Sequence, residues 1–136
     1  MDELLDELRS TRIRLGPSAL HGVGVFAIAD IAAGDRDLFA PPSPWRSVLM
    51  SDVERLPVHV QELVMTYCLK HDGVAYVPPH GFRLIDPVIY LNDSKDPNLK
   101  QVDGGNYFEA LRDIRAGEEL TVDYDTLEVE SAHSTE

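Results

Sequence analysis

The sequence predicts a mainly β fold with few helices, and three features support this fold class. Short runs of alternating apolar and polar residues, rich in β-branched side chains, lie between glycines and prolines. Apolar residues at helical spacing extend over only one longer stretch, residues 51–68. A strand-turn-strand pattern also occurs twice, at residues 30–35 and 113–118. These features favour several small sheets joined by turns.

Length and composition indicate one globular domain. The chain has 136 residues, 43% of them hydrophobic and 26% charged, which suits a folded domain of ordinary size. No apolar run is long enough for a membrane span, and the acidic opening MDELLDELRS does not resemble a secretion signal. Cys68 is the only cysteine, which excludes an internal disulfide and a cysteine-based zinc cluster. We therefore expect no metal site, no membrane partner and a cytoplasmic or nuclear location.

The charge balance bears on the choice of partner. Twelve Lys and Arg residues against twenty-four Asp and Glu residues give a net charge of −12. This charge opposes direct binding to nucleic acid and attracts a basic peptide. Acidity also keeps a small domain soluble, so charge alone does not establish a peptide partner.

The first elements follow from apolar spacing. Leu4, Leu5 and Leu8 predict a short amphipathic helix over residues 2–9, which caps the domain or contacts a partner. Alternating and β-branched residues then predict strands near residues 13–15 and 23–28. Prolines interrupt the chain before a further apolar run that begins at Trp45.

The one long helix is expected between residues 51 and 68. Ser51 and Glu54 have the spacing of a capping box, which predicts that the helix begins at Ser51. Pro57 divides the helix and is expected to be the first residue of its second part. Five residues form its predicted apolar face: Val60, Leu63, Val64, Tyr67 and Cys68.

The repeated pattern predicts a pair of β corners. Asp-Ile-Ala-Ala-Gly-Asp at residues 30–35 recurs as Asp-Ile-Arg-Ala-Gly-Glu at residues 113–118. In each copy the glycine suits a turn that needs a positive φ, and the isoleucine anchors the turn in the core. We expect both corners in one β-rich domain.

Three polar or glycine-rich segments are candidates for chemistry. Gly22-Val23-Gly24 matches a dinucleotide fingerprint loosely, but the β-branched residues that follow predict no helix, so a hairpin without a ligand is favoured. Residues 92–98, Asn-Asp-Ser-Lys-Asp-Pro-Asn, have the composition of a loop. Residues 117–125 predict a turn and then a strand that ends on Tyr124.

In this order, the three segments resemble the SET family of protein methyltransferases. The resemblance covers residues 11–125, between the N-terminal helix of residues 1–10 and an acidic tail of residues 126–136. It implies a β-clip fold of several small sheets, in which the asparagine loop forms a C-terminal pseudoknot. It also implies methyl transfer from S-adenosylmethionine to a lysine side chain of a protein.

The resemblance assigns roles to individual residues. The backbone of Gly22, Val23 and Gly24 would line the amino-acid end of the cofactor, Asn92 would bind its ammonium, and the backbone of Asp93 would meet the adenine. Tyr124 would be the catalytic tyrosine. Tyr67 resembles a second active-site tyrosine of the family, although it also lies on the predicted apolar face of the helix.

The chain departs from the family pattern at several positions. Asp93 stands where the family usually has histidine, and no cysteine triad follows Tyr124 to form a zinc-bound cap. Leu127 and Val129, or a second copy of the chain in a homodimer, are candidates to cover the channel. Gln101 and Val122 lie at positions where relatives vary an aromatic residue to limit how many methyl groups are added. Neither residue is aromatic here, and they do not predict the number of methyl groups.

Two other functions remain open at the level of sequence. The first is a catalytically silent SET-like module that binds a basic peptide or protein, an alternative favoured by Asp93 and the missing cap. The second is a small acidic β-rich interaction protein whose motif matches are accidental.

Overall fold

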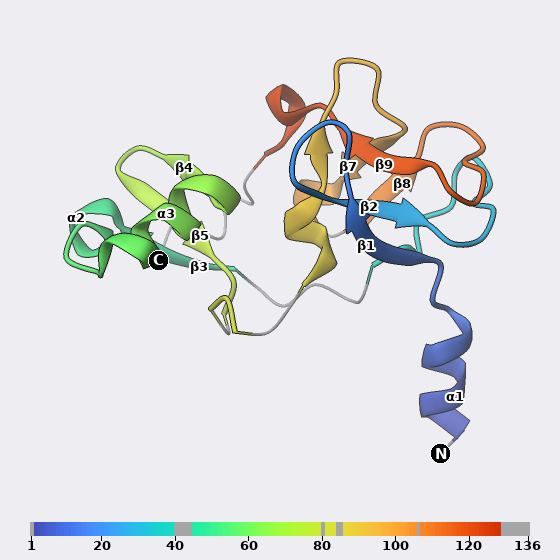
Figure 1. Cartoon of the computed structure of the whole chain (residues 1–136), viewed down its shortest axis with the longest axis horizontal. Coiled ribbons are helices and arrows are strands. Elements are labelled where there is room, and N and C mark those ends of the chain that lie inside the picture. The colour runs from blue at the N-terminus through green and yellow to red at the C-terminus, as the bar shows by residue number, and fades with distance from the viewer. Residues whose placement is uncertain (1, 40–44, 80, 84–85, 106, 129–136) are drawn as a thin grey trace. The chain divides into compact units, whose positions relative to one another are not determined.

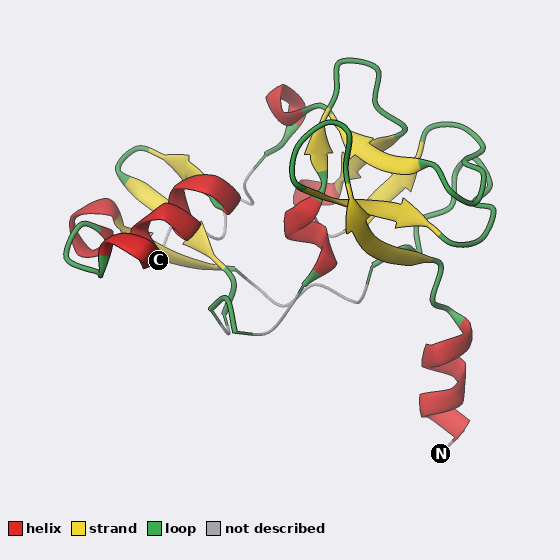
Figure 2. Ribbon diagram, viewed as in Figure 1, coloured by secondary structure: helices red, strands yellow, loops and turns green. Residues whose placement is uncertain are grey.

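The computed structural model describes residues 2–39, 45–79, 81–83, 86–105 and 107–128. The chain forms two compact units. The first contains residues 1–42 and 90–128, and the second contains residues 43–89 and 129–136. Both are built from short strands with long connecting loops (Figure 2), which confirms the prediction of a mainly β protein with several small sheets.

The largest sheet lies in the first unit and has the strand order β1-β2-β9-β6. Its strands are β1 (Ile13–Pro17), β2 (Val23–Ala27), β9 (Glu119–Val122) and β6 (Asn92–Asp93). β9 pairs antiparallel with β2 on one edge and parallel with β6 on the other. Figure 1 shows β2 and β9 side by side, although residues 28–118 separate them in sequence. The strands predicted near residues 13–15 and 23–28 are confirmed as β1 and β2.

Two further elements complete the first unit. β7 (Leu99–Val102) and β8 (Tyr107–Ala110) form an antiparallel hairpin that brings the chain back toward β9. The predicted N-terminal helix is present as α1 (Asp2–Arg9). Its three leucines are between 40% and 59% exposed, so α1 adds little to the core of the unit: Leu4, Leu5 and Leu8.

The two predicted corners meet face to face in the first unit. Ile31 and Ile114 are each 1% exposed and exchange two backbone hydrogen bonds of 2.7 Å. The side chain of Asp30 accepts a hydrogen bond of 2.9 Å from the amide of Ala116 in the other corner. Asp113 accepts an equal bond from Ala33. The corners therefore form one joint, held by the same hydrogen bonds on both sides.

Positive backbone angles explain the glycine in each corner. Gly34 has φ +88° and Gly117 has φ +97°, a region that residues with a side chain rarely adopt. Each glycine amide donates to the last residue of a strand, Ala110 for Gly34 and Ala27 for Gly117. The turn thus fixes the direction in which the chain leaves each strand.

The second unit has a sheet with the order β3-β5-β4. Its elements are β3 (Arg46–Leu49), α2 (Met50–Val53), α3 (Val58–Tyr67), β4 (Leu69–His71) and β5 (Val74–Val77). Its core consists of four buried residues: Val53, Val64, Cys68 and Ala75. A 3₁₀ turn, η1 (Pro87–Tyr90), lies where the chain passes from the second unit back into the first.

The predicted start of the long helix was wrong. α2 begins at Met50 with Leu49 as its N-cap, and Ser51 makes no capping hydrogen bond. The cause is tertiary, because β3 runs directly into α2 and the amide of Met50 donates to the carbonyl of Gly73. Pro57 is the N-cap of α3 and not its first residue.

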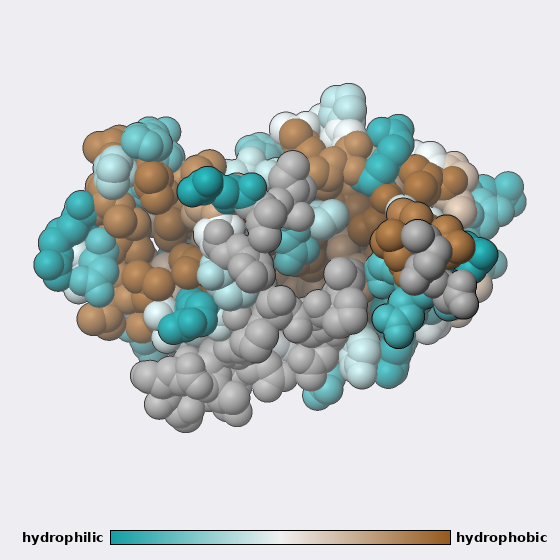
Figure 3. All heavy atoms as spheres, turned by 90° about the horizontal axis from the view of Figure 1, so that it is seen from below, coloured by the Kyte–Doolittle hydropathy of each residue, from teal (hydrophilic) through white to brown (hydrophobic). Residues whose placement is uncertain are grey.

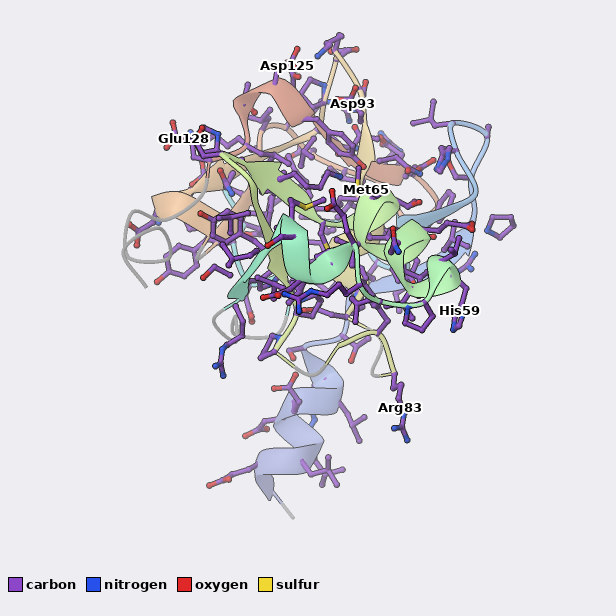
Figure 4. The ribbon with its side chains drawn as sticks, turned by 90° about the vertical axis from the view of Figure 1, so that its left-hand side faces the viewer. His59, Met65, Arg83, Asp93, Asp125 and Glu128 are labelled. Carbon is purple, nitrogen blue, oxygen red and sulfur yellow. The ribbon has the colours of Figure 1, made fainter. Side chains whose placement is uncertain are left out.

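The buried face of α3 is narrower than the sequence predicts. Val64 is 2% exposed, whereas Leu63 is 36% exposed and Met65, labelled in Figure 4, is 53% exposed. Figure 3 shows apolar side chains gathered on the surface of this unit. Within the part of the chain that the structure describes, no helix is long and apolar enough to cross a membrane.

Candidate active site

The side chain of Asn92 lies at the centre of a polar network in the first unit. Asn92 is 6% exposed, and its amide nitrogen faces several acceptors. Glu119 Oε2 is 2.8 Å from Asn92 Nδ2, and both Ser18 Oγ and the His21 carbonyl are 3.1 Å away. Because acceptors surround the nitrogen, the orientation of the amide is fixed. Its oxygen, Oδ1, has no donor among the residues that the structure describes.

Glu119 links this network to the glycine at position 24. Its carboxylate accepts a hydrogen bond from Ser18 Oγ at 2.8 Å and lies directly over the Gly24 backbone. A Cβ on Gly24 would collide with the Glu119 carboxylate and lie 3.1 Å from Asn92 Nδ2. A side chain at this position would therefore displace the Glu119 carboxylate from its place beside Asn92.

The remaining residues of the predicted cofactor segment border the same network. Gly22 has φ +46° and closes the turn between β1 and β2, where its carbonyl accepts a hydrogen bond from the Ser18 amide. Val23 is 41% exposed and begins β2. Because a strand and not a helix follows Gly24, the structure supports the hairpin interpretation of this segment and excludes the dinucleotide fingerprint.

Asn98 has a structural role that the sequence analysis missed. It is 2% exposed, and both ends of its side chain bind the backbone of β9. Asn98 Nδ2 donates to the Glu119 carbonyl, and Asn98 Oδ1 accepts from the Thr121 amide, each at 2.8 Å. Asn98 thus acts in place of a neighbouring strand and fixes β9 next to Asn92.

Tyr124 lies two residues after the end of β9, in a single turn, η3 (Tyr124–Thr126). The strand predicted to end on Tyr124 therefore ends at Val122, because Asp123 caps the turn that follows. Its hydroxyl donates to the Leu91 carbonyl at 2.5 Å, and its amide donates to Asp93 Oδ1 at 2.8 Å. Burial, and to a lesser extent the charge of Asp93, raises the pKa of the Tyr124 hydroxyl. Tyr124 is therefore a neutral phenol near pH 7, and its proton is already engaged by Leu91.

The segment 91–93 thus brings Tyr124 and Asn92 together. Leu91 binds the Tyr124 hydroxyl, and Asn92 is the next residue. Asp93 pairs through its backbone with β9 in the same parallel register that pairs Asn92 with Thr121. The Asp93 side chain therefore braces the tyrosine turn, while its backbone belongs to the sheet.

The other sequence-based candidates belong to the second unit, have other partners in the first unit or lie outside the described residues. Tyr67 is the last residue of α3 in the second unit, so the geometry of the first unit gives no test of its predicted role. Gln101 pairs with the backbone of Glu128 through two hydrogen bonds of 3.0 and 2.6 Å. Val122 is 1% exposed in the core, Leu127 is half-buried, and Val129 lies outside the described residues.

No group of three metal-ligating side chains comes together in the described part of the chain. Cys68 is buried in the second unit, and burial raises the pKa of its thiol to about 11. A thiol with this pKa is a poor nucleophile at neutral pH. The chemistry available in the first unit therefore comes from Tyr124, Asn92 and Glu119.

The SET domain family model matches residues 22–125, which include this whole network except Ser18 and His21. The chain belongs to the SET domain family. Members of this family are typically S-adenosylmethionine-dependent protein lysine methyltransferases. No curated protein sequence matches this SET domain.

Solved structures have the same fold. A candidate histone methyltransferase of Plasmodium falciparum is 20% identical with a TM-score of 0.52, over 84% of this chain and 93% of that one. Chaetomium thermophilum Polycomb Repressive Complex 2, as a humanized mutant bound to GSK126, is 22% identical with a TM-score of 0.55. That match covers 86% of this chain and 15% of the larger one, so this SET domain spans only a small part of the Polycomb chain.

Proposed function

We propose that this SET domain transfers a methyl group from S-adenosylmethionine to the side-chain amine of a lysine in a protein. The observation that carries the proposal is the arrangement of Leu91 and Asn92. Leu91 holds the hydroxyl of Tyr124, and the adjacent Asn92 fixes its amide nitrogen in the network and leaves Oδ1 without a donor among the described residues. One short segment thus borders both a cofactor site and a reaction site.

The residues of the network fit the cofactor. The ammonium of its amino-acid portion needs hydrogen-bond acceptors, and Asn92 Oδ1 provides one in a largely buried position. The Glu119 carboxylate adds a negative charge beside Asn92. Backbone groups of Gly22 and Val23 border the same place. When bound, the cofactor supplies a methyl group on a positively charged sulfur.

Tyr124 is suited to position the incoming amine. Its hydroxyl proton is bound by Leu91, so the lone pairs of its oxygen remain to accept a hydrogen bond from the amine. The same oxygen dipole favours the positive charge that moves with the methyl group. Because its pKa is raised, Tyr124 is not a base for the lysine. The amine must lose its proton by desolvation before transfer.

The negative charge supports a basic substrate. A lysine-bearing peptide with further basic residues would be drawn to a domain of net charge −12. The Plasmodium relative, described as a histone methyltransferase, supports a histone-like basic protein as the substrate. We propose no direct contact with nucleic acid, and a second copy of the chain remains a candidate partner.

Replacing Tyr124 tests the proposal. Tyr124→Phe should slow single-turnover methyl transfer at least ~100-fold, the scale expected when one preorganised polar group is lost from a reaction site. The dissociation constant for S-adenosylmethionine, measured by calorimetry, should change little. Tyr107→Phe is the matched control, because Tyr107 is equally exposed in the same unit, at 46% against 47%. A Tyr124→Phe rate equal to that of wild type would overturn the assignment.

Asp93 favours one second candidate function, a catalytically silent module that binds a basic partner. This residue replaces the usual histidine, and its carboxylate is used to hold the Tyr124 amide. Calorimetry of the wild-type protein with S-adenosylmethionine separates the two functions. Binding at micromolar concentrations supports the enzyme, and no binding at tens of micromolar supports the silent module.

A further inference from the structure

Lys95 is a cation bound at the tyrosine turn. Its ammonium lies 2.8 Å from Asp123 Oδ1 and 2.6 Å from Asp125 Oδ2, the residues on either side of Tyr124. Figure 4 shows Asp93 and Asp125 at the same end of the first unit. The turn therefore carries three carboxylates in a short space, and among the described residues Lys95 is the positive group paired with them.

Lys95 lies two residues after β6, in the bend that follows this strand. Both Asp93 and Lys95 contact the tyrosine turn. The amide of Ser94, between them, donates to the Val122 carbonyl at 2.9 Å and continues the pairing with β9. Leu91, Asp93 and Lys95 thus hold the turn at three separate points.

The contacts of Lys95 continue into the backbone of the turn. Asp123 Oδ1, which binds Lys95, also accepts the amide of Asp125 at 3.0 Å and so caps η3. The Asp123 carbonyl accepts the Thr126 hydroxyl at 2.7 Å. Without Lys95, the carboxylates of Asp93, Asp123 and Asp125 would repel one another across this cap. The hydrogen bond between Tyr124 and Leu91 would then lose its fixed geometry.

We propose that Lys95 is a positioning residue for Tyr124, and the proposal rests on the methyl transfer proposed above. Lys95 does not touch the reacting atoms. It bridges the two aspartates that flank Tyr124, offsets part of their negative charge and thereby keeps the phenol oxygen in place. Because Lys95 is 63% exposed, it contributes little to the stability of the whole domain, and its effect is confined to the tyrosine turn.

The test compares Lys95→Met with Lys100→Met in the full chain. Lys100 is a matched control, since it is an exposed lysine of the same unit whose partner is Glu109 on β8, away from Tyr124. Amide hydrogen exchange should become at least ~10-fold faster at Tyr124 and Asp125 in Lys95→Met. Amides of the β1–β2 pair should keep their protection. Lys100→Met should exchange as wild type at both positions, and Lys95→Arg should restore slow exchange.

Methyl transfer gives the second measurement. Lys95→Met should reduce kcat about tenfold, while the dissociation constant for S-adenosylmethionine and the free energy of unfolding remain at wild-type values. Unchanged exchange at Tyr124, or a loosened turn with an unchanged kcat, would overturn the proposal. If the wild-type protein transfers no methyl group, the proposed function fails. Hydrogen exchange then still decides whether Lys95 positions Tyr124.

Discussion

The two corners of the first unit share their hydrogen bonds but lead to different surroundings. In both, an aspartate accepts an amide from the other corner and an isoleucine joins the central bridge. After the corner at residues 113–118, the chain enters β9 and reaches Tyr124. After the corner at residues 30–35, no strand follows directly. The repeated turn therefore forms the contact between the two corners. The segment that follows each turn determines whether the chain leads to the candidate active site.

The first residue after each corner illustrates this difference between the two copies. Arg36 follows the first corner and forms an exposed ion pair with Glu109 at 2.7 Å. Glu119 follows the second corner, and its carboxylate binds Ser18 and Asn92 within the site. The same place in the repeat thus carries a surface cation in one copy and a site carboxylate in the other.

Truncation of the two bridging isoleucines tests whether the two corners contribute equally to the free energy of unfolding. Ile31→Ala and Ile114→Ala should each reduce the free energy of unfolding by about 2–5 kcal/mol, because both side chains are 1% exposed. Urea denaturation measures the loss. If a variant fails to fold, the valine substitution should give a smaller loss of about 0.5–1.5 kcal/mol. A large loss at only one position would show that the corners are unequal.

Substitution of the residues after the corners should separate their functions. Glu119→Gln should weaken binding of S-adenosylmethionine about tenfold. The substitution replaces the Glu119 carboxylate, which accepts the hydrogen bond from Asn92 Nδ2, with a neutral amide. Arg36→Gln is the matched control and should leave binding unchanged. Calorimetry gives both dissociation constants. Equal binding by wild type and Glu119→Gln would remove Glu119 from the candidate site.

The smallest effect is expected from the reciprocal aspartates. Asp30→Ala and Asp113→Ala each delete one hydrogen bond of 2.9 Å at an exposed position and should cost about 1 kcal/mol of unfolding free energy. Because the two bonds stabilise one joint, the double variant should lose less than the sum of the single losses. Strict additivity would indicate that the corners act independently.

Local sequence was sufficient to predict the two glycine turns and the first strands, but the strand expected directly after residues 30–35 is absent from described residues 36–39. A turn such as residues 113–118 is specified by its own glycine and isoleucine, so its pattern is visible without knowledge of the fold. The family and the β fold with few helices also followed from the motifs. The threading of the asparagine loop as a pseudoknot and the role of Tyr67 remain predictions.

Contacts between distant segments were not predictable in the same way. Asn98 appeared as an ordinary turn residue, because nothing near it in sequence indicates that β9 will lie within reach of its side chain. Glu119 appeared as the polar start of a strand, although its partners are Ser18 and Asn92. The wrong helix start at Ser51 has a similar cause, the contact between Met50 and Gly73.

The position of β1 has a practical consequence for work on fragments. The region matched by the family model begins at residue 22, yet β1 and Ser18 precede it. A fragment begun there would leave the backbone of β2 as an open edge, which favours intermolecular strand pairing and aggregation. It would also lose the hydroxyl that binds Glu119. A soluble fragment suited to crystallisation or ligand screening should therefore begin no later than Ile13.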